Sequence, residues 1–140
     1  AILVASSVCC GPPVPGPTAP AAESDPQSNQ DKPPQVTLSA GSTYEVPGRG
    51  TAVTFVRVTE DSRCPTGVNC VWEGDAAVEL SVEAGAAAPA TVQLHTHDRF
   101  DREATAGGLR LRLESLEPYP RADRAIAAGE YRIVLSISTQ

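Results

Sequence analysis

Hydrophobic and polar residues alternate along several short stretches of the chain beyond residue 35. Successive side chains of a strand point to opposite faces, so this pattern gives a strand one apolar and one polar face. It is clearest in residues 76–83, 90–96, 109–116 and 131–138. Its apolar positions are Ala76, Val78, Leu80, Val82, Val92, Leu94, Leu109, Leu111, Leu113, Tyr131, Ile133, Leu135 and Ile137. One solvated face per strand is expected of antiparallel sheets in a sandwich or barrel.

Short runs rich in Val, Leu and Thr predict further strands, and Gly, Pro and Asp turns separate them. These strands are expected at residues 36–39, 43–46, 52–59 and 70–72. Residues 52–59 place apolar side chains on both faces, which predicts either burial on both sides or a bulge. Helical turns are expected at most in residues 104–106 and 121–128. The predicted fold is therefore all-β: a single antiparallel β-sandwich or open barrel of about 7–8 strands over residues 36–140.

Residues 11–35 differ in composition from the rest of the chain. They contain eight of the thirteen prolines, with Ser, Gln, Asn and Ala between them, and no Ile, Leu or aromatic residue. Such a segment cannot bury a core, and its proline content favours an extended conformation. We expect a disordered, Pro-rich tether in front of the β-domain.

Residues 1–10 read as the end of a signal peptide, because an apolar run leads into small residues and two cysteines. Cys9 or Cys10 is then a candidate lipidation site that anchors the protein to a membrane. Cleavage after Ala21 is an alternative, since Ala19 and Ala21 are small residues at the required spacing, and it would give a secreted protein. In both cases we expect export, to the cell envelope or beyond it.

The charge balance argues against two classes of partner. The net charge is −6, and the 17 acidic residues are interleaved with the 11 basic ones. Nucleic acids and anionic membrane surfaces both require a basic stripe, so neither is expected to bind. The number of residues predicts one core, and we expect a monomer.

Cys64 and Cys70 enclose a short loop, Pro65, Thr66, Gly67, Val68 and Asn69. Pro65 and Gly67 favour a turn that brings the two sulfurs within disulfide range, and an exported domain would oxidise the pair. The disulfide acts either as a staple of a small domain or as a rigid binding loop. Zinc is a weaker alternative, because structural zinc sites prefer cysteines separated by two to four residues.

Trp72 is the only tryptophan and lies two residues beyond Cys70. On a regular strand the two side chains share a face, which predicts that the indole packs against the disulfide in the core. The alternative is an exposed anchor at the base of the loop. Tyr119, between two prolines, is likewise expected to fill the core.

His95 and His97 share one strand face and form a candidate metal-binding pair. Asp98 and Asp101 follow within reach of a third ligand. The alternative is two solvated histidines in front of a polar loop. Glu73 and Asp75 flank Gly74 and are expected to form a solvated hairpin turn.

No pairing of a nucleophile with a base is visible in the sequence. We therefore expect no catalysis and no cofactor.

Two motifs resemble sequences in a group of small bacterial envelope proteins, many of which carry lipoprotein-type signals. The first runs Asp61-Ser-Arg-Cys-Pro-x4-Cys70-Val-Trp72-x-Gly74-x-Ala76, and the second is Leu116-x-Pro-Tyr-Pro followed by Ile126 and Tyr131-Arg. The similarity covers residues 36–140, with Glu73 where a small residue is expected. It implies an exported β-domain and brings no activity, since none is established for the group.

These observations predict an exported, tethered β-domain that acts as a binding or accessory module of the cell envelope. Its partner is an unidentified envelope protein or small ligand. One alternative is a protease-type inhibitor or docking protein that presents the Cys64–Cys70 loop. Another is a metal-binding protein that uses His95 and His97.

Overall fold

The computed structural model describes Gly11, Gly16 and residues 32–140. The chain divides into two units, Ala1–Gln30 and Asp31–Gln140. The candidate lipidation residues Cys9 and Cys10, and most of the predicted tether, lie outside the described residues. The second unit is the β-domain.

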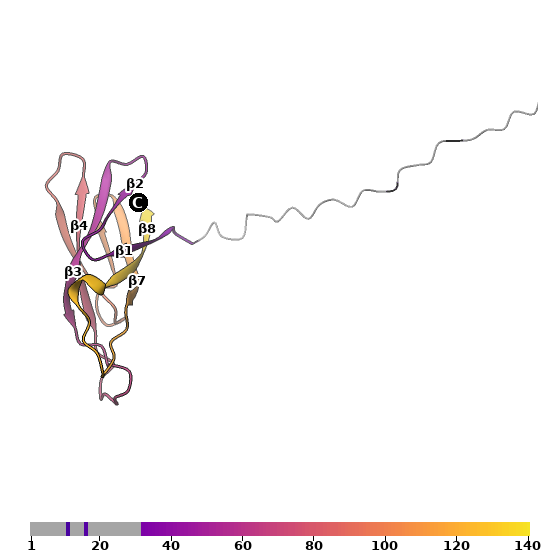
Figure 1. The fold of residues 1–140 in the computed structure, drawn as a ribbon. Helices are drawn as coiled ribbons and strands as arrows, with labels where there is room; N and C mark the ends of the chain where they lie inside the picture. The colour runs from indigo at the N-terminus through magenta and orange to yellow at the C-terminus, as the bar shows by residue number, and fades with distance from the viewer. Residues whose placement is uncertain (1–10, 12–15, 17–31) are drawn as a thin grey trace, which may run out of the picture. The chain divides into compact units, whose positions relative to one another are not determined.

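Two antiparallel four-stranded sheets make up residues 32–140, which confirms the all-β sandwich (Figure 1). One sheet has the order β1-β8-β7-β6 and the other β2-β3-β4-β5. The eight strands of this part of the chain are β1 (Gln35–Ser39), β2 (Thr43–Val46), β3 (Thr51–Asp61), β4 (Ala76–Ala84), β5 (Ala90–His95), β6 (Glu103–Ala106), β7 (Leu109–Glu117) and β8 (Arg132–Thr139). A 3₁₀ helix, η2, covers Ala128–Glu130.

The core lies between the sheets and consists of the side chains that the alternation assigned to it. In β4, Ala76, Val78, Leu80 and Val82 are all at most 1% exposed. The corresponding apolar side chains of β7 and β8 face them. Ser136 departs from the pattern: it lies in β8 at a position predicted to be solvated, but it is buried and donates a hydrogen bond to Glu114 Oε1 at 2.6 Å.

Strand β3 is bulged, as its apolar residues on both faces suggested. Its register against β4 shifts between Phe55 and Arg57 and again between Val58 and Glu60. Phe55 is fully buried, whereas Val56 is exposed. The extra residues bend the strand and change which side chains face inward.

Two local predictions were wrong. Residues 70–72 form no strand, because the disulfide holds Cys70 at the tip of the β3–β4 loop. Backbone pairing between the two sides of this loop resumes only at Glu73, whose carbonyl accepts from Cys64 N–H. Residues 104–106 form no helical turn but belong to the edge strand β6. Gly107 and Gly108, at φ 58° and 72°, make the tight turn that folds β6 back onto β7.

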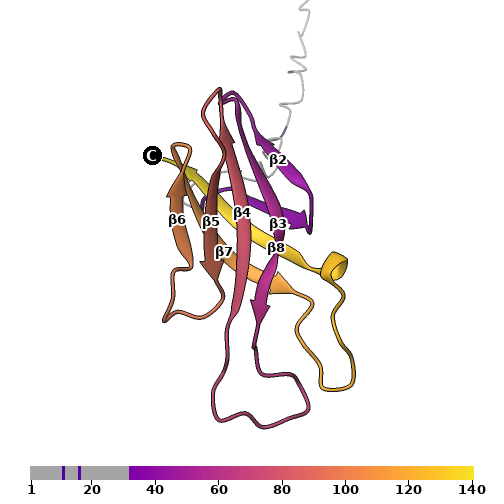
Figure 2. The same ribbon diagram turned by 90° about the vertical axis from the view of Figure 1, so that its left-hand side faces the viewer.

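The loops of the sandwich gather at its two ends (Figure 2). One end carries the β3–β4, β5–β6 and β7–β8 loops, and the other carries the tight turns β2–β3, β4–β5 and β6–β7. We call the first the long-loop end. None of the described residues forms a helix long and apolar enough to cross a bilayer.

Candidate functional site

The predicted disulfide is present in the β3–β4 loop, with the Cα atoms of Cys64 and Cys70 5.9 Å apart. The loop is also fixed to the β7–β8 loop through the backbone of Thr66. Its N–H donates to Pro120 O at 3.0 Å, and its carbonyl accepts from Ala122 N–H at 3.2 Å. Gly67, Val68 and Asn69 remain exposed at the tip.

Arg63 closes the long-loop end beneath the disulfide. Its side chain is only 6% exposed. The guanidinium donates twice to the Asp61 carboxylate, at 2.8 and 2.7 Å, and also to the carbonyls of Leu116 at 2.8 Å and Pro118 at 3.0 Å. It lies 5.2 Å from the centre of the Tyr119 ring. One cation thus connects β3, the end of β7 and the following loop.

Asp61 is the counter-ion of this cluster. It also accepts a hydrogen bond from the Tyr131 hydroxyl at 3.0 Å. Burial by itself would raise the pKa of Asp61, but the hydrogen bonds and charge of Arg63 and the bond from Tyr131 outweigh it and lower the pKa. Burial and the Asp61 carboxylate raise the pKa of Tyr131. The two motifs of the sequence therefore meet in space, because Asp61 and Arg63 come from the first and Leu116, Pro118, Tyr119 and Tyr131 come from the second.

Gly74 allows the β3–β4 loop to return close to its outgoing arm. A Cβ at this position would lie 1.9 Å from the carbonyl oxygen of Ser62, and its φ is +72°. Only glycine fits such an approach at a positive φ. The next residue, Asp75, is joined to Ser62 by the bond from Ser62 N–H to Asp75 O, 2.7 Å long.

Asp75 organises the start of the β5–β6 loop and is not the solvated turn residue predicted from sequence. Its Oδ1 accepts from the backbone N–H of His97 at 2.9 Å and from both the N–H and the hydroxyl of Thr96 at 3.1 Å. Its Oδ2 lies 2.5 Å from His95 Nδ1. Burial would raise the pKa of Asp75, but the bonds from His95, His97 and Thr96 outweigh it and lower the pKa. The neighbouring Glu73 is exposed, as expected.

The two histidines lie near each other and are held by different acids. His95 pairs with Asp75, and its ring centre is 5.1 Å from that of Phe100. His97 Nε2 lies 3.4 Å from Glu73 Oε2, and its Nδ1 accepts from Arg99 N–H at 3.1 Å. The described residues contain no group of three or more His, Cys, Asp or Glu side chains placed to hold a metal ion. Asp98, one predicted third ligand, is instead paired with Arg102 at 2.8 Å.

Trp72 is 76% exposed, so the prediction that it packs into the core was wrong. The space beneath the loop is occupied by Arg63 and its partners, and the disulfide holds the chain before Trp72 at the tip of the loop. Tyr119 is likewise not a core side chain, since it is 47% exposed. The exposure of Trp72 agrees with the alternative interpretation, an exposed anchor at the base of the loop.

A groove of about 670 Å³ lies beside Trp72 at the long-loop end. Three exposed hydrophobic side chains line it: Val71 (89% exposed), Trp72 and Phe100 (54%). Monomeric domains seldom expose large hydrophobic residues side by side without a use for them. The other lining residues are polar or small, namely Glu60, Ser62, Glu73, Gly74, Asp75, His95, His97 and Arg99.

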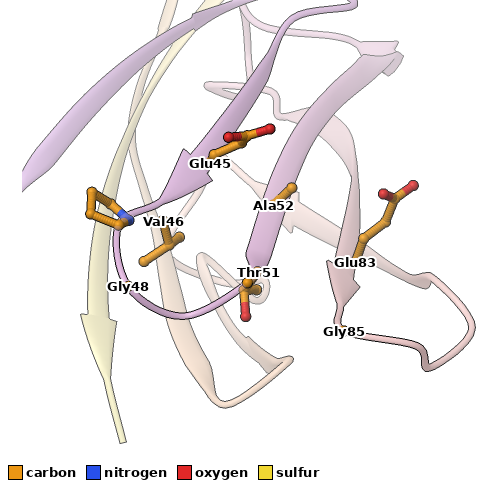
Figure 3. Close-up of a pocket in the computed structure, with 9 residues that line it drawn as sticks. Glu45, Val46, Gly48, Thr51, Ala52, Glu83 and Gly85 are labelled. Atoms are coloured by element: carbon orange, nitrogen blue, oxygen red, sulfur yellow. The ribbon is translucent and has the colours of Figure 1, made fainter.

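A second depression, of about 550 Å³, lies at the opposite end beside the β2–β3 turn (Figure 3). Glu45, Ala52 and Glu83 lie in one row across β2, β3 and β4. Val46, Thr51 and the turn backbone complete the wall, which has no aromatic side chain. Sequence reasoning indicated neither depression, because each depends on how separate loops and turns come together.

Comparisons of the chain with protein-family models, with curated proteins and with solved structures gave no match. The disulfide indicates that the domain folds in an oxidising, exported location.

Proposed function

We propose that this protein is an exported binding or accessory module of the cell envelope, and that the long-loop end is its binding surface. The observation that carries the proposal is the side-by-side exposure of Val71, Trp72 and Phe100 around one groove. Buried, these side chains would strengthen the core, yet the fold places them in solvent on a frame fixed by a disulfide and a buried ion pair. Aromatic side chains on rigid loops are typical of binding hot spots.

The tether and the cysteines near the N-terminus suggest how the module is positioned. A Pro-rich segment over residues 11–35 would hold the domain away from an anchoring point. We propose lipid attachment at Cys9 or Cys10 as that point, with secretion as the alternative. Mass spectrometry of the protein isolated from its membrane fraction distinguishes the two, since acylation adds the mass of the lipid chains.

The inhibitor alternative receives less support from the geometry. The backbone of Thr66 already makes both of its hydrogen bonds within the chain, to Pro120 and Ala122. An inhibitory loop needs its backbone groups available to the protease. The metal alternative also receives less support, because residues 32–140 contain no group of three or more His, Cys, Asp or Glu side chains placed to hold an ion. Among residues 32–140 we find no side-chain arrangement that supports catalysis, and we propose none.

The binding surface is tested by capture of envelope extract on the immobilised full chain. The variants are Trp72→Ala and a matched control, Val56→Ala, which removes an exposed apolar side chain that does not line the groove. We expect Trp72→Ala to lose a specific captured component that wild type and Val56→Ala retain. Capture of the same components by all three proteins would reject the long-loop end as the binding surface.

A further inference from the structure

The groove beside Trp72 combines an aromatic wall with carboxylates at its edge, and this combination indicates the chemistry of its ligand. We propose that it binds the side chain of a lysine in a peptide segment of a partner protein. This inference rests on the proposed function and specifies the ligand of that same surface. The reasons are the apolar surface, the charge and the hydrogen-bonding groups of the groove.

The apolar surface suits an alkyl chain that ends in a cation. Val71, Trp72 and Phe100 offer contact for the methylene groups of a lysine, which are commonly packed against apolar surface while the ammonium stays polar. The exposed indole also offers its π face, and tryptophan is the aromatic side chain that attracts cations most strongly. A neutral alkyl group would use only the first of these two features.

The charge of the groove is complementary to a cation. Three carboxylates, of Glu60, Glu73 and Asp75, line it against one guanidinium, of Arg99, which leaves a net charge of −2 with neutral histidines. Within residues 32–140, Glu60 forms no ion pair, and Glu73 is 89% exposed with only the 3.4 Å contact to His97. Charge complementarity of this kind selects partners and speeds their encounter.

The histidines add an acceptor. Asp75 engages Nδ1 of His95, and a neutral imidazole that donates from Nδ1 keeps Nε2 as an acceptor. No residue in the described part of the chain forms a hydrogen bond with this Nε2. A primary ammonium brings three donors and no acceptor, and can therefore donate both to this ring nitrogen and to the carboxylates of the groove.

The depression at the opposite end lacks part of this combination. Glu45 and Glu83 supply carboxylates there, but no aromatic side chain accompanies them. These two residues therefore provide a control for charge alone.

The test is an NMR titration of the isotope-labelled full chain with three short peptides. They are acetylated and amidated, and carry at one central position lysine, Nε-acetyl-lysine or norleucine. Because Trp72 is the only tryptophan, a single indole N–H signal reports on the groove. We expect the lysine peptide to shift this signal. The other two peptides should bind with about tenfold lower affinity, which is the scale of a cation–π contact plus local charge.

Substitutions separate the contributions. Trp72→Phe keeps an aromatic face, whereas Trp72→Leu keeps only apolar surface. Trp72→Leu should therefore weaken binding of the lysine peptide several-fold more than Trp72→Phe, as measured by the shifts of the backbone amide signals of the groove. The double variant Glu60→Gln/Glu73→Gln should weaken binding severalfold. The matched control Glu45→Gln/Glu83→Gln, which changes net charge equally at the other end, should leave it unchanged. Trp72 and the four glutamates are all exposed, so these substitutions should leave the fold intact.

Equal affinity for the lysine and acetyl-lysine peptides would overturn the inference, as would equal weakening by the two double variants. Binding of a chitooligosaccharide in place of the lysine peptide would also overturn it and identify a glycan as the occupant. The proposed function is tested by a different measurement, the capture of an envelope component that depends on Trp72. If Trp72-dependent capture from the envelope persists while no lysine peptide binds, the binding surface stands and only the ligand chemistry is wrong.

Discussion

Replacing Arg63 by alanine tests whether the buried cation holds the long-loop end together. The substitution removes both hydrogen bonds to Asp61 and those to the carbonyls of Leu116 and Pro118. It leaves the Asp61 carboxylate, whose side chain is 11% exposed, with only the Tyr131 hydroxyl and the backbone N–H of residue 63.

The magnitude follows from this list of lost contacts. Removing one partner of a buried, hydrogen-bonded ion pair costs about 3–5 kcal/mol, mostly because the other charge is left uncompensated. The carbonyls of Leu116 and Pro118 also each lose the hydrogen bond from the Arg63 guanidinium, and this loss is included in the same total of about 3–5 kcal/mol. A domain of this size is stable by about 5–15 kcal/mol, so the variant should fold with much of its stability lost.

The assay is urea unfolding followed by far-ultraviolet circular dichroism. Tryptophan emission is a poor probe here, because Trp72 is already 76% exposed in the folded state. Arg57→Ala is the matched control: its side chain is 65% exposed and contacts Glu79 at 3.4 Å, so it should cost about 1 kcal/mol or less. Arg63→Lys keeps the charge but not the planar set of donors, and should lie between wild type and alanine.

If Arg63→Ala costs no more than Arg57→Ala, the buried cation does not hold the long-loop end together. A double-mutant cycle with Asp61→Ala then shows whether the two side chains interact at all. A coupling free energy near zero would mean that the ion pair is not what stabilises this end of the sandwich.

Three further predictions concern the same end. Gly74→Ala should cost several times the roughly 1–2 kcal/mol of Gly85→Ala, measured by thermal unfolding, because both have positive φ but only Gly74 has a backbone atom within 4 Å of the added Cβ. The paired change Cys64→Ser/Cys70→Ser should lower stability in urea by about 2 kcal/mol, the loop entropy of so short a ring, and no change would exclude a staple role. The carboxyl of Asp75 has a pKa in the folded protein below its usual 3.8. The ionised carboxylate therefore stabilises the fold above that pH, and this stabilisation disappears as the pH falls through the folded pKa. The free energies of unfolding of wild type and Asp75→Asn should converge in acid, and a difference that stays constant with pH would contradict the prediction.

The sequence by itself determined the sandwich and its core. Alternation assigned Val78, Leu80, Leu111 and Leu135 to the buried side correctly, because a strand buried on one face has a fixed period of two. It also predicted the Cys64–Cys70 disulfide, because Pro65 and Gly67 favour a local turn that brings the two cysteines together.

Errors arose where pairing partners are distant in sequence. Strand β6 has only four residues, and its two apolar positions are alanines. It forms because Gly107 and Gly108 fold it onto β7, so its own residues carry little signal. Ser136 was assigned to solvent because its environment depends on Glu114 across the sheet.

Only the tertiary structure decided the site. Nothing local indicates that Arg63 is buried, because its acceptors at residues 116 and 118 are far along the chain. That cation and its partners occupy the space beneath the loop, and Trp72 lies exposed to solvent beside Phe100 and the two histidines. Periodicity specifies which face of a strand is apolar, whereas the contacts between loops depend on where the sheets bring their ends together.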